Sequence, residues 1–377
     1  MRSFILSLAA LLPLASCQLN DYAKKVGLKY FGAATDSPGQ RERAGYEAAY
    51  SKYDTILNDP KEFGQTTPTN GMKWLFTEPE PGVFNYTEGE IVATIARNTN
   101  KLLRCHALVW HNQLAPWVEA NTTVWTPDTL RAAITRHIAN VAGHWKGRCY
   151  AWDVVNEALD EDGTYRKSLF YKILGEEYIK LAFTVASHVD PDAKLYYNDY
   201  GIERPASAKT AGAKRIIKML KDAGIRIDGV GMQAHLHADS HPTVDEHVQT
   251  MKQFSEELGV SEVAFTELDV RIPTPVNDTS LQWQKEAYRN VAAACVQVEA
   301  CVGITIWDFY DPFSWVPATF PGQGAALLWN EDFSKHPAYD GIIDVFKNMT
   351  TARGGSGDGA GCKAKRRATT PSLRTII

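Results

Sequence analysis

Two apolar segments that each end in a glutamate constrain the fold of this 377-residue chain more than any other feature. Residues 151–155 (AWDVV) run into Asn156 and Glu157, and residues 263–266 (VAFT) run into Glu267. Neither segment alternates between apolar and polar residues, which is typical of short strands covered on both faces. A glutamate after a strand can simply cap the next helix. The recurrence of the same design 110 positions later instead favours a fold that brings distant strand ends together.

The chain alternates strand-like and helix-like segments along its length. Thr126-Pro127 and His336-Pro337 are helix starts, and helices are predicted over 208–220, 244–258 and 281–298. A chain of this size can bury one large core, and the alternation predicts a single α/β domain, a (β/α)8 TIM barrel. The eight predicted strands are 30–35, 63–67, 102–109, 150–156, 194–198, 229–235, 263–267 and 303–307.

The two ends of the chain differ in character from its body. Residues 1–17 have a basic start, an apolar middle and a small-residue end, which predicts a secretory signal peptide. This apolar run is too short to span a membrane, and no other segment comes near the required length, so we expect a soluble, secreted protein. Residues 349–377 are rich in Gly, Ser and basic residues and are expected to form a disordered tail, which leaves 18–348 as the catalytic domain.

Secretion fits the sequons and the cysteines. N-glycosylation is predicted in loops at Asn85, Asn121, Asn277 and Asn348. Cys295 and Cys301 are separated by a short gap between a helix and a strand, and we expect them to form a disulfide. Cys105 lies inside an apolar strand and is expected to be a free buried thiol. Cys149 and Cys362 have no evident partner in the sequence.

The charge of the chain excludes one class of ligand. Residues 18–348 carry 33 basic and 43 acidic side chains, a net charge of −10. An acidic body without a basic groove argues against nucleic acid as a partner. The charge is compatible with a neutral polymer.

Polar side chains gather where the predicted strands end, and in a barrel these ends form the active site. Two glutamates among amides, imidazoles and tryptophans are typical of a carbohydrate hydrolase, because carboxylates cleave the glycosidic bond, indoles stack on sugar rings and amides bind hydroxyls. The candidate residues are Asn70, Lys73, His106, Trp110, Gln113, Asn156, Glu157, Tyr200, Gln233, His235, Glu267, Asp269, Trp307 and Trp315.

The order of these motifs resembles the family ten glycoside hydrolases, the fungal endo-1,4-β-xylanases, over roughly residues 20–348. Each matching motif falls near a predicted strand end. The matching segments are 71–74 (GMKW), 106–113 (HALVWHNQ), 152–157 (WDVVNE), 197–200 (YNDY), 231–235 (GMQAH), 266–269 (TELD) and 303–307 (GITIW).

The resemblance implies a role for each candidate. Glu157 corresponds to the general acid/base and Glu267 to the nucleophile of a retaining double displacement. His235 corresponds to the histidine that binds the nucleophile and is held by Asp269, and Asn156 to the amide that binds the sugar 2-hydroxyl. The resemblance implies sugar contacts for Asn70, Lys73, His106, Trp110, Gln113, Tyr200 and Gln233.

Substrate choice follows from analogy at two positions. Trp307 and Trp315 correspond to walls beside the sugar upstream of the cut, whose bulk disfavours a hydroxymethyl group and so selects xylan over cellulose. One departure stands at Thr69, where the family usually carries a glutamate that binds the sugar two units upstream. We therefore expect weaker binding of that sugar.

Three alternative functions compete with a xylanase. His235, His237, Asp239 and His241 could form the ligand set of a metal-dependent hydrolase, but three of them fall in a loop region. A non-catalytic carbohydrate-binding barrel would have no need of both glutamates. A β-1,4-glucanase on the same barrel is the closest competitor, because only a few groove side chains decide the substrate. The hypothesis adopted is a monomeric xylanase that uses no metal and no cofactor.

Overall fold

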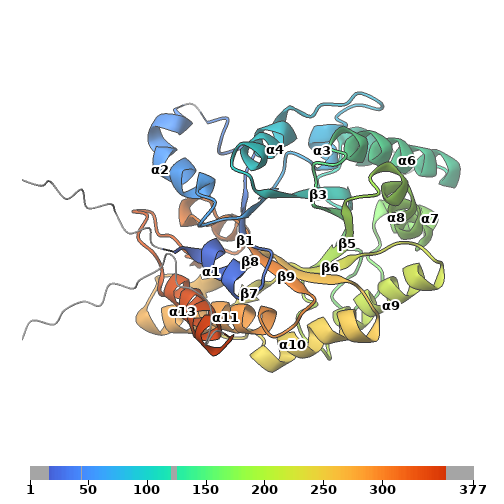
Figure 1. Cartoon of the computed structure of the whole chain (residues 1–377). Coiled ribbons are helices and arrows are strands. Elements are labelled where there is room, and N and C mark those ends of the chain that lie inside the picture. Colours follow the sequence, from blue (N-terminus) through green and yellow to red (C-terminus); the bar gives the residue numbers. More distant parts are fainter. Residues whose placement is uncertain (1–16, 44, 120–124, 354–377) are drawn as a thin grey trace, which may run out of the picture.

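Eight parallel strands close on themselves around the centre of the molecule (Figure 1). The computed structural model describes residues 17–43, 45–119 and 125–353. Pairing of β9 with both β1 and β8 closes the ring, which confirms the predicted (β/α)8 barrel. Around the barrel the strands are β1 (Tyr30–Thr35), β2 (Gln65–Pro68), β3 (Leu102–Trp110), β4 (Ala151–Asn156), β5 (Lys194–Asp199), β6 (Gly229–Met232), β8 (Glu262–Pro273) and β9 (Cys301–Ile306).

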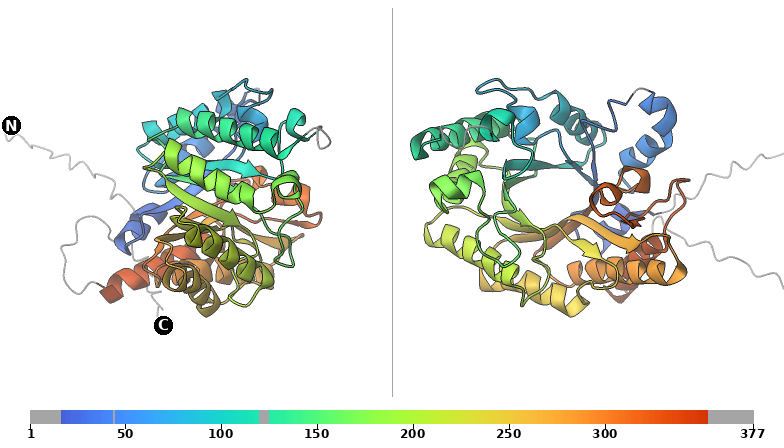
Figure 2. Two further views of the ribbon diagram at one scale, coloured as in Figure 1. Left: turned by 90° about the vertical axis from the view of Figure 1, so that its right-hand side faces the viewer. Right: turned by 180° about the vertical axis from the view of Figure 1, so that it is seen from behind.

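Helices lie between consecutive strands and form a ring outside the barrel (Figure 2). The predicted helix start at Thr126 is confirmed, because its side chain accepts a hydrogen bond from the Thr129 backbone N–H and Pro127 is the first helical residue. The longer helices are α1 (Leu19–Lys25), α2 (Tyr46–Asn58), α4 (Thr87–Asn98), α6 (Pro127–His144), α8 (Glu177–Val189), α9 (Ala208–Asp222), α10 (Val244–Lys252), α11 (Asp278–Cys295) and α13 (Pro337–Arg353). The short elements are α3 (Trp74–Thr77), α5 (Pro116–Glu119), α7 (Leu169–Leu174), α12 (Val316–Thr319), the 3₁₀ turn η2 (Asp311–Phe313) and the two-residue strand β10 (Gln323–Gly324).

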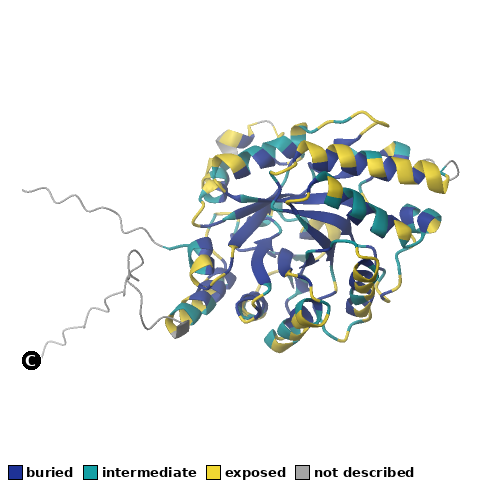
Figure 3. Ribbon diagram, turned by 45° about the vertical axis from the view of Figure 1, so that its right-hand side comes forward, coloured by how far each residue is buried: buried dark blue, intermediate teal, exposed yellow. Residues whose placement is uncertain are grey.

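The strands are buried and the helices expose their outer faces (Figure 3). All six residues of β4 are buried, because side chains on one face fill the barrel and those on the other face pack against helices. This double burial is the physical reason why the strand sequences show no polar alternation.

Several predicted elements differ from the structure in extent; the strand predicted over 263–267, for example, is the longer β8 (Glu262–Pro273). The predicted strand 229–235 divides into β6 and a separate strand β7 (His235–His237), which pairs with the long end of β8. Ala234 between them has a positive φ of 60°, which breaks the regular extended backbone. The helix predicted over 244–258 is α10 followed by a π-helical turn, η1 (Gln253–Glu257).

The folded region extends beyond its predicted end at residue 348. Helix α13 continues to Arg353, and Met349 packs against the hydrophobic core. The tail prediction is therefore wrong for residues 349–353, and residues 354–377 with Cys362 lie outside the described residues. Asn348 lies within α13 and not in a loop, whereas Asn85 and Asn277 are exposed outside helices. The Asn121 sequon lies outside the described residues.

Two disulfides join elements of the barrel. The predicted Cys295–Cys301 bond is confirmed, with a Cα–Cα distance of 5.3 Å. The prediction that Cys105 is a free thiol is wrong, because Cys105 is bonded to Cys149 with a Cα–Cα distance of 5.8 Å. These cysteines are 44 positions apart, and they meet because the chain enters β4 alongside β3, with Tyr150 N donating to Leu103 O at 2.8 Å.

Candidate active site

The carboxyl ends of the barrel strands surround a cleft of about 740 Å³. Parallel strands present these ends on one face, so residues distant in sequence meet there. All the predicted catalytic and substrate-contacting residues line the cleft: Asn70, Lys73, His106, Trp110, Gln113, Asn156, Glu157, Tyr200, Gln233, His235, Glu267, Trp307 and Trp315. Asp269 does not line it but lies fully buried behind His235.

Glu157 stands immediately after β4 and faces two neutral donors. Trp110 Nε1 donates to its Oε2 at 2.8 Å, and Gln233 Nε2 donates to its Oε1 at 3.1 Å. The Glu157 backbone has a positive φ of 55°, an uncommon conformation for a residue with a side chain. Its N–H donates to Asn198 O at 2.9 Å, which ties this turn to the end of β5. Strain of this kind is often retained where a turn has to aim a functional side chain.

Glu267 lies on β8 and is 5% exposed. Asn198 Nδ2 donates to its Oε1 at 2.7 Å, and His235 Nε2 lies 3.2 Å from its Oε2. His106 Nδ1 is 3.9 Å from Oε1. Both carboxylate oxygens are therefore held by polar groups from other strands.

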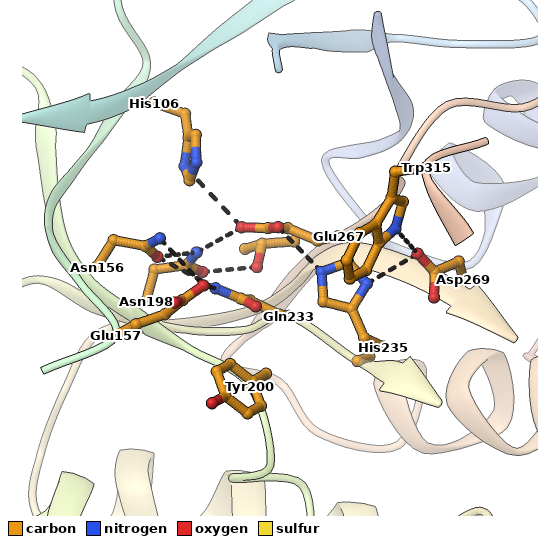
Figure 4. Close-up of polar contacts among 12 residues, drawn as sticks. His106, Asn156, Glu157, Asn198, Tyr200, Gln233, His235, Glu267, Asp269 and Trp315 are labelled. Atoms are coloured by element: carbon orange, nitrogen blue, oxygen red, sulfur yellow. Dashed lines mark hydrogen bonds and ion pairs between the residues drawn. The ribbon is translucent and has the colours of Figure 1, made fainter. Parts of the chain in front are cut away.

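Three side-chain amides connect the two glutamates (Figure 4). Asn198 Nδ2, which contacts Glu267, and Gln233 Nε2, which contacts Glu157, lie 2.9 Å and 3.2 Å from the side-chain amide of Asn156. Because the three amides come from β4, β5 and the end of β6, the relative position of the two carboxylates depends on the closure of the barrel. The amides fix both carboxylates in place before any ligand binds.

His235 carries a positive charge beside Glu267. Its Nδ1 lies 2.8 Å from Asp269 Oδ2, and that same oxygen accepts from Trp315 Nε1 at 2.7 Å. Burial opposes a charged imidazole, but the Asp269 and Glu267 carboxylates outweigh it and raise the pKa of His235 to about 10. The imidazolium donates from both nitrogens, so it stabilises a negative charge on Glu267. The predicted contacts of His235 with Glu267 and Asp269 are confirmed.

The side chain of His106 is held by the Arg104–Asp153 ion pair, which the sequence did not predict. Its Nδ1 lies 2.9 Å from Asp153 Oδ2, and Arg104 forms two hydrogen bonds with the same carboxylate. Arg104 and Asp153 are each only 1% exposed. Burial alone would raise the pKa of Asp153, but Arg104 and His106 outweigh it and lower that pKa below its usual range. This pair inside the barrel fixes the orientation of the His106 ring.

At one end of the cleft, the ends of β2 and β3 supply a polar cluster. Lys73 Nζ donates to Gln113 Oε1 at 2.5 Å and to Asn70 Oδ1 at 3.2 Å, and it lies 4.5 Å from the centre of the Trp110 ring. Burial is the main reason why the pKa of Lys73 falls to about 8, and the nearby carboxylates limit the fall. A cation, amides and an indole face form a surface suited to sugar hydroxyls.

A second polar cluster is formed by the loops after β4 and β5. Tyr200 OH donates to Glu161 Oε1 at 2.5 Å and accepts from Arg166 Nη2 at 3.0 Å. Arg166 Nε also donates to the backbone oxygen of Glu157 at 3.1 Å. Tyr200 is therefore held at a fixed angle to the Glu157 turn.

Several residues of the site were missed from the sequence. Asn198 could have been found, because it lies at a predicted strand end beside Asp199 and Tyr200. Asp153 and Arg104 gave no signal beyond being charged residues inside apolar strands, and their pairing follows from the register of β3 with β4. Further lining residues lie in loops, in short helical turns and in the extension of β8, whose paths the sequence did not predict: Asp36, Asn112, Glu161, Arg271, Asp308, Phe313, Thr319 and Phe320.

The histidines of the alternative metal site have other partners. Both ring nitrogens of His235 are occupied by Glu267 and Asp269, and His237 Nδ1 lies 2.5 Å from Asp239 Oδ1. Across residues 17–43, 45–119 and 125–353, no group of three or more His, Cys, Asp or Glu side chains is arranged to hold a metal ion.

Comparison with known proteins gives close matches. The model of the Glycosyl hydrolase family 10 matches residues 18–345. Endo-1,4-beta-xylanase A of Humicola insolens is 67% identical over 332 residues, which cover 88% of this chain and 87% of that protein. Endo-1,4-beta-xylanase D of Talaromyces funiculosus is 48% identical over 91% of this chain and 80% of its own length. Xylanase 10B from Thermotoga petrophila RKU-1, solved with xylobiose, superimposes with a TM-score of 0.83 at 36% identity over 89% of this chain and 99% of that chain.

Proposed function

The chain belongs to glycosyl hydrolase family 10, and from this premise we propose that it is an endo-1,4-β-xylanase that cleaves internal bonds of xylan with retention of configuration. The observation that carries this proposal is the pair of glutamates, Glu157 and Glu267, which three side-chain amides connect. Glu267 lies next to the His235 imidazolium, whereas Glu157 accepts hydrogen bonds from the neutral donors Trp110 and Gln233. This asymmetry suits a double displacement, which needs one charged and one protonated carboxyl group.

In the first step, Glu267 acts as the nucleophile. Its carboxylate attacks the anomeric carbon while the proton of Glu157 passes to the glycosidic oxygen, so that the leaving sugar departs as an alcohol and a covalent glycosyl-enzyme forms. The His235 imidazolium donates a hydrogen bond to the Glu267 carboxylate before the attack. Trp110 Nε1 and Gln233 Nε2 orient the Glu157 carboxyl toward the leaving oxygen.

In the second step, Glu157 acts as a base. It accepts a proton from water, the oxygen of that water attacks the anomeric carbon, and the bond to Glu267 breaks, which restores both side chains. Asn156 is the proposed donor to the sugar 2-hydroxyl, a contact that strengthens as positive charge develops on the ring. Since Asn198 and Gln233 hold the Asn156 amide, it need not reorganise during the reaction.

Two tryptophans are the proposed basis of substrate choice. Trp315 packs against His235 with ring centres 4.9 Å apart and is fixed by Asp269, and Trp307 lies next to the rings of both His106 and His235. Walls held this rigidly leave little room for the hydroxymethyl group that glucose carries and xylose lacks.

The decisive experiment compares two polymers. We expect release of reducing sugar from beechwood xylan or arabinoxylan, with little release from carboxymethylcellulose. Faster hydrolysis of carboxymethylcellulose than of xylan would favour the alternative function, a β-1,4-glucanase, over a xylanase. Polarimetry or NMR of the first product should show the β-anomer, and an α-anomer would contradict the double displacement.

The proposed setting is extracellular, with xylan as the partner and no nucleic acid, membrane or cofactor required. Within the part of the chain that the structure describes, no helix has the length and apolar character to cross a bilayer. We propose that the enzyme acts as a monomer, because one chain supplies both glutamates and the side chains that hold them.

A further inference from the structure

Asp36 is a cleft residue to which neither the sequence motifs nor the proposed mechanism gives a role. It follows β1 directly and lines the cleft. Its Oδ1 accepts hydrogen bonds from Thr69 Oγ1 at 2.8 Å and from Asn70 Nδ2 at 2.6 Å. Among the described residues no donor bonds to Oδ2. A carboxylate offers about four acceptor positions, so Asp36 is held by one oxygen and keeps acceptor capacity on the other.

The neighbours of Asp36 are groups that recognise sugar hydroxyls. Asn70, which donates to Asp36, accepts from Lys73 Nζ at 3.2 Å and from Gln113 Nε2 at 3.0 Å. All these side chains line the same end of the cleft. Asp36 adds a negatively charged acceptor to a cluster of donors, and a sugar hydroxyl both donates and accepts hydrogen bonds.

The loop that carries Asp36 is anchored independently of it. Arg41 bonds to Asp54 at 2.9 Å and to Thr35 Oγ1 at 3.1 Å, and Gln40 Nε2 donates to Asp308 Oδ2 at 3.1 Å. Gly39 has a φ of +131°, and a Cβ there would lie 2.6 Å from Asp36 Oδ2. The loop therefore fits closely around a carboxylate that is not needed to hold the loop in place.

We propose that Asp36 is a substrate-binding residue whose carboxylate accepts hydrogen bonds from hydroxyl groups of the xylose two units upstream of the cleaved bond. This inference rests on the proposed xylanase function. Thr69 stands where the resemblance implies a glutamate for that sugar, and its side chain carries no carboxylate. Instead, Thr69 donates to Asp36, so the carboxylate at this end of the cleft comes from the β1 loop and not from the end of β2.

The test uses two chromogenic substrates on the same enzyme preparation. An aryl β-xyloside occupies only the sugar position at the point of cleavage, whereas an aryl β-xylobioside also occupies the position upstream. In Asp36→Asn we expect kcat/KM for the xylobioside to fall roughly ten- to a hundred-fold, because a charge-assisted hydrogen bond is lost. The value for the xyloside should stay within about twofold of the wild type.

The ratio of the two kcat/KM values decides the outcome, since the fraction of folded enzyme cancels from it. The matched control is Asp54→Asn, which alters a carboxylate that anchors the same loop outside the cleft; its ratio should equal that of the wild type. An unchanged ratio in Asp36→Asn overturns the inference, and so does an equal change of the ratio in Asp54→Asn. A wild type inactive on both xylosides and on xylan would instead remove the proposed function.

Discussion

The Nε2 atom of His235, on β7, lies 3.2 Å from Oε2 of Glu267, on β8, and both side chains are largely buried. The second nitrogen of His235 contacts Asp269, so two carboxylates share one imidazolium. The group next to the proposed nucleophile is therefore a cation up to about pH 10. This relationship links the pH dependence of stability to the chemistry of the site.

Replacing the proposed nucleophile should abolish turnover and spare binding. Glu267→Ala removes the attacking carboxylate, and we expect kcat on xylan to fall by roughly 10⁴-fold or more. Calorimetry with a xylo-oligosaccharide should show an affinity close to that of the wild type. Added azide should restore some cleavage of an activated aryl xylobioside and yield the α-azide, because the small anion attacks from the face that the carboxylate occupied. A β-azide product would contradict the assignment.

Replacing the proposed acid should separate substrates by their leaving group. Glu157→Ala removes proton donation, which xylan requires and a dinitrophenyl leaving group does not. We expect kcat on xylan to drop roughly 10²- to 10⁴-fold, with a much smaller drop in the glycosylation step of dinitrophenyl β-xylobioside. Pre-steady-state kinetics measures that step directly. Comparable losses on the two substrates would rule out Glu157 as the acid.

Stability should decline with rising pH in a way that depends on His235. The folded-state pKa of about 10 lies above the unfolded value of 6.5, so the imidazolium contributes its full stability below pH 6.5. That contribution, on the order of a few kcal/mol, is lost as the pH rises from 6.5 to about 10. His235→Gln should flatten this part of the Tm profile. The exposed His188→Gln is the control and should keep the wild-type slope.

Removing the charge of Asp153 should destabilise the barrel interior. Asp153→Asn leaves Arg104 buried without its counter-ion, which we expect to cost about 3 to 5 kcal/mol in urea unfolding. Asp222→Asn removes an exposed partner of Lys218 and should cost less than about 1 kcal/mol. Similar costs for the two variants would show that the buried pair has no special role.

The Cys105–Cys149 and Cys295–Cys301 disulfides should differ in their contribution to stability. Loop-closure entropy predicts about 4 kcal/mol for the Cys105–Cys149 bond and about 2 kcal/mol for Cys295–Cys301, because the first closes the longer loop. Urea unfolding of the two double alanine variants measures this difference. Each variant also loses core volume, at buried Cys105 in one and at buried Cys295 in the other. A larger cost for the Cys295–Cys301 variant would reverse the predicted order.

The sequence determined the architecture and which residues at the predicted strand ends line the site. Apolar segments without alternation require strands covered on both faces, and eight of them between helices leave few arrangements other than a barrel. In a parallel barrel the strand ends share one face, so Glu157 and Glu267 were predicted to line one cleft although they are distant in the chain. The Thr126 cap and the Cys295–Cys301 bond were also predictable, because each depends on residues close together in sequence.

The tertiary structure alone decided which side chains hold the site residues in place. The Cys105–Cys149 bond, the Arg104–Asp153 pair beneath His106 and the Asp36 carboxylate beside Thr69 each join residues at least 33 positions apart. Their contacts depend on strand register, on the path of the β1 loop and on side-chain direction. A sequence pattern reports the period and the ends of an element, but register and loop path follow from the packing of the closed barrel, to which every element contributes at once.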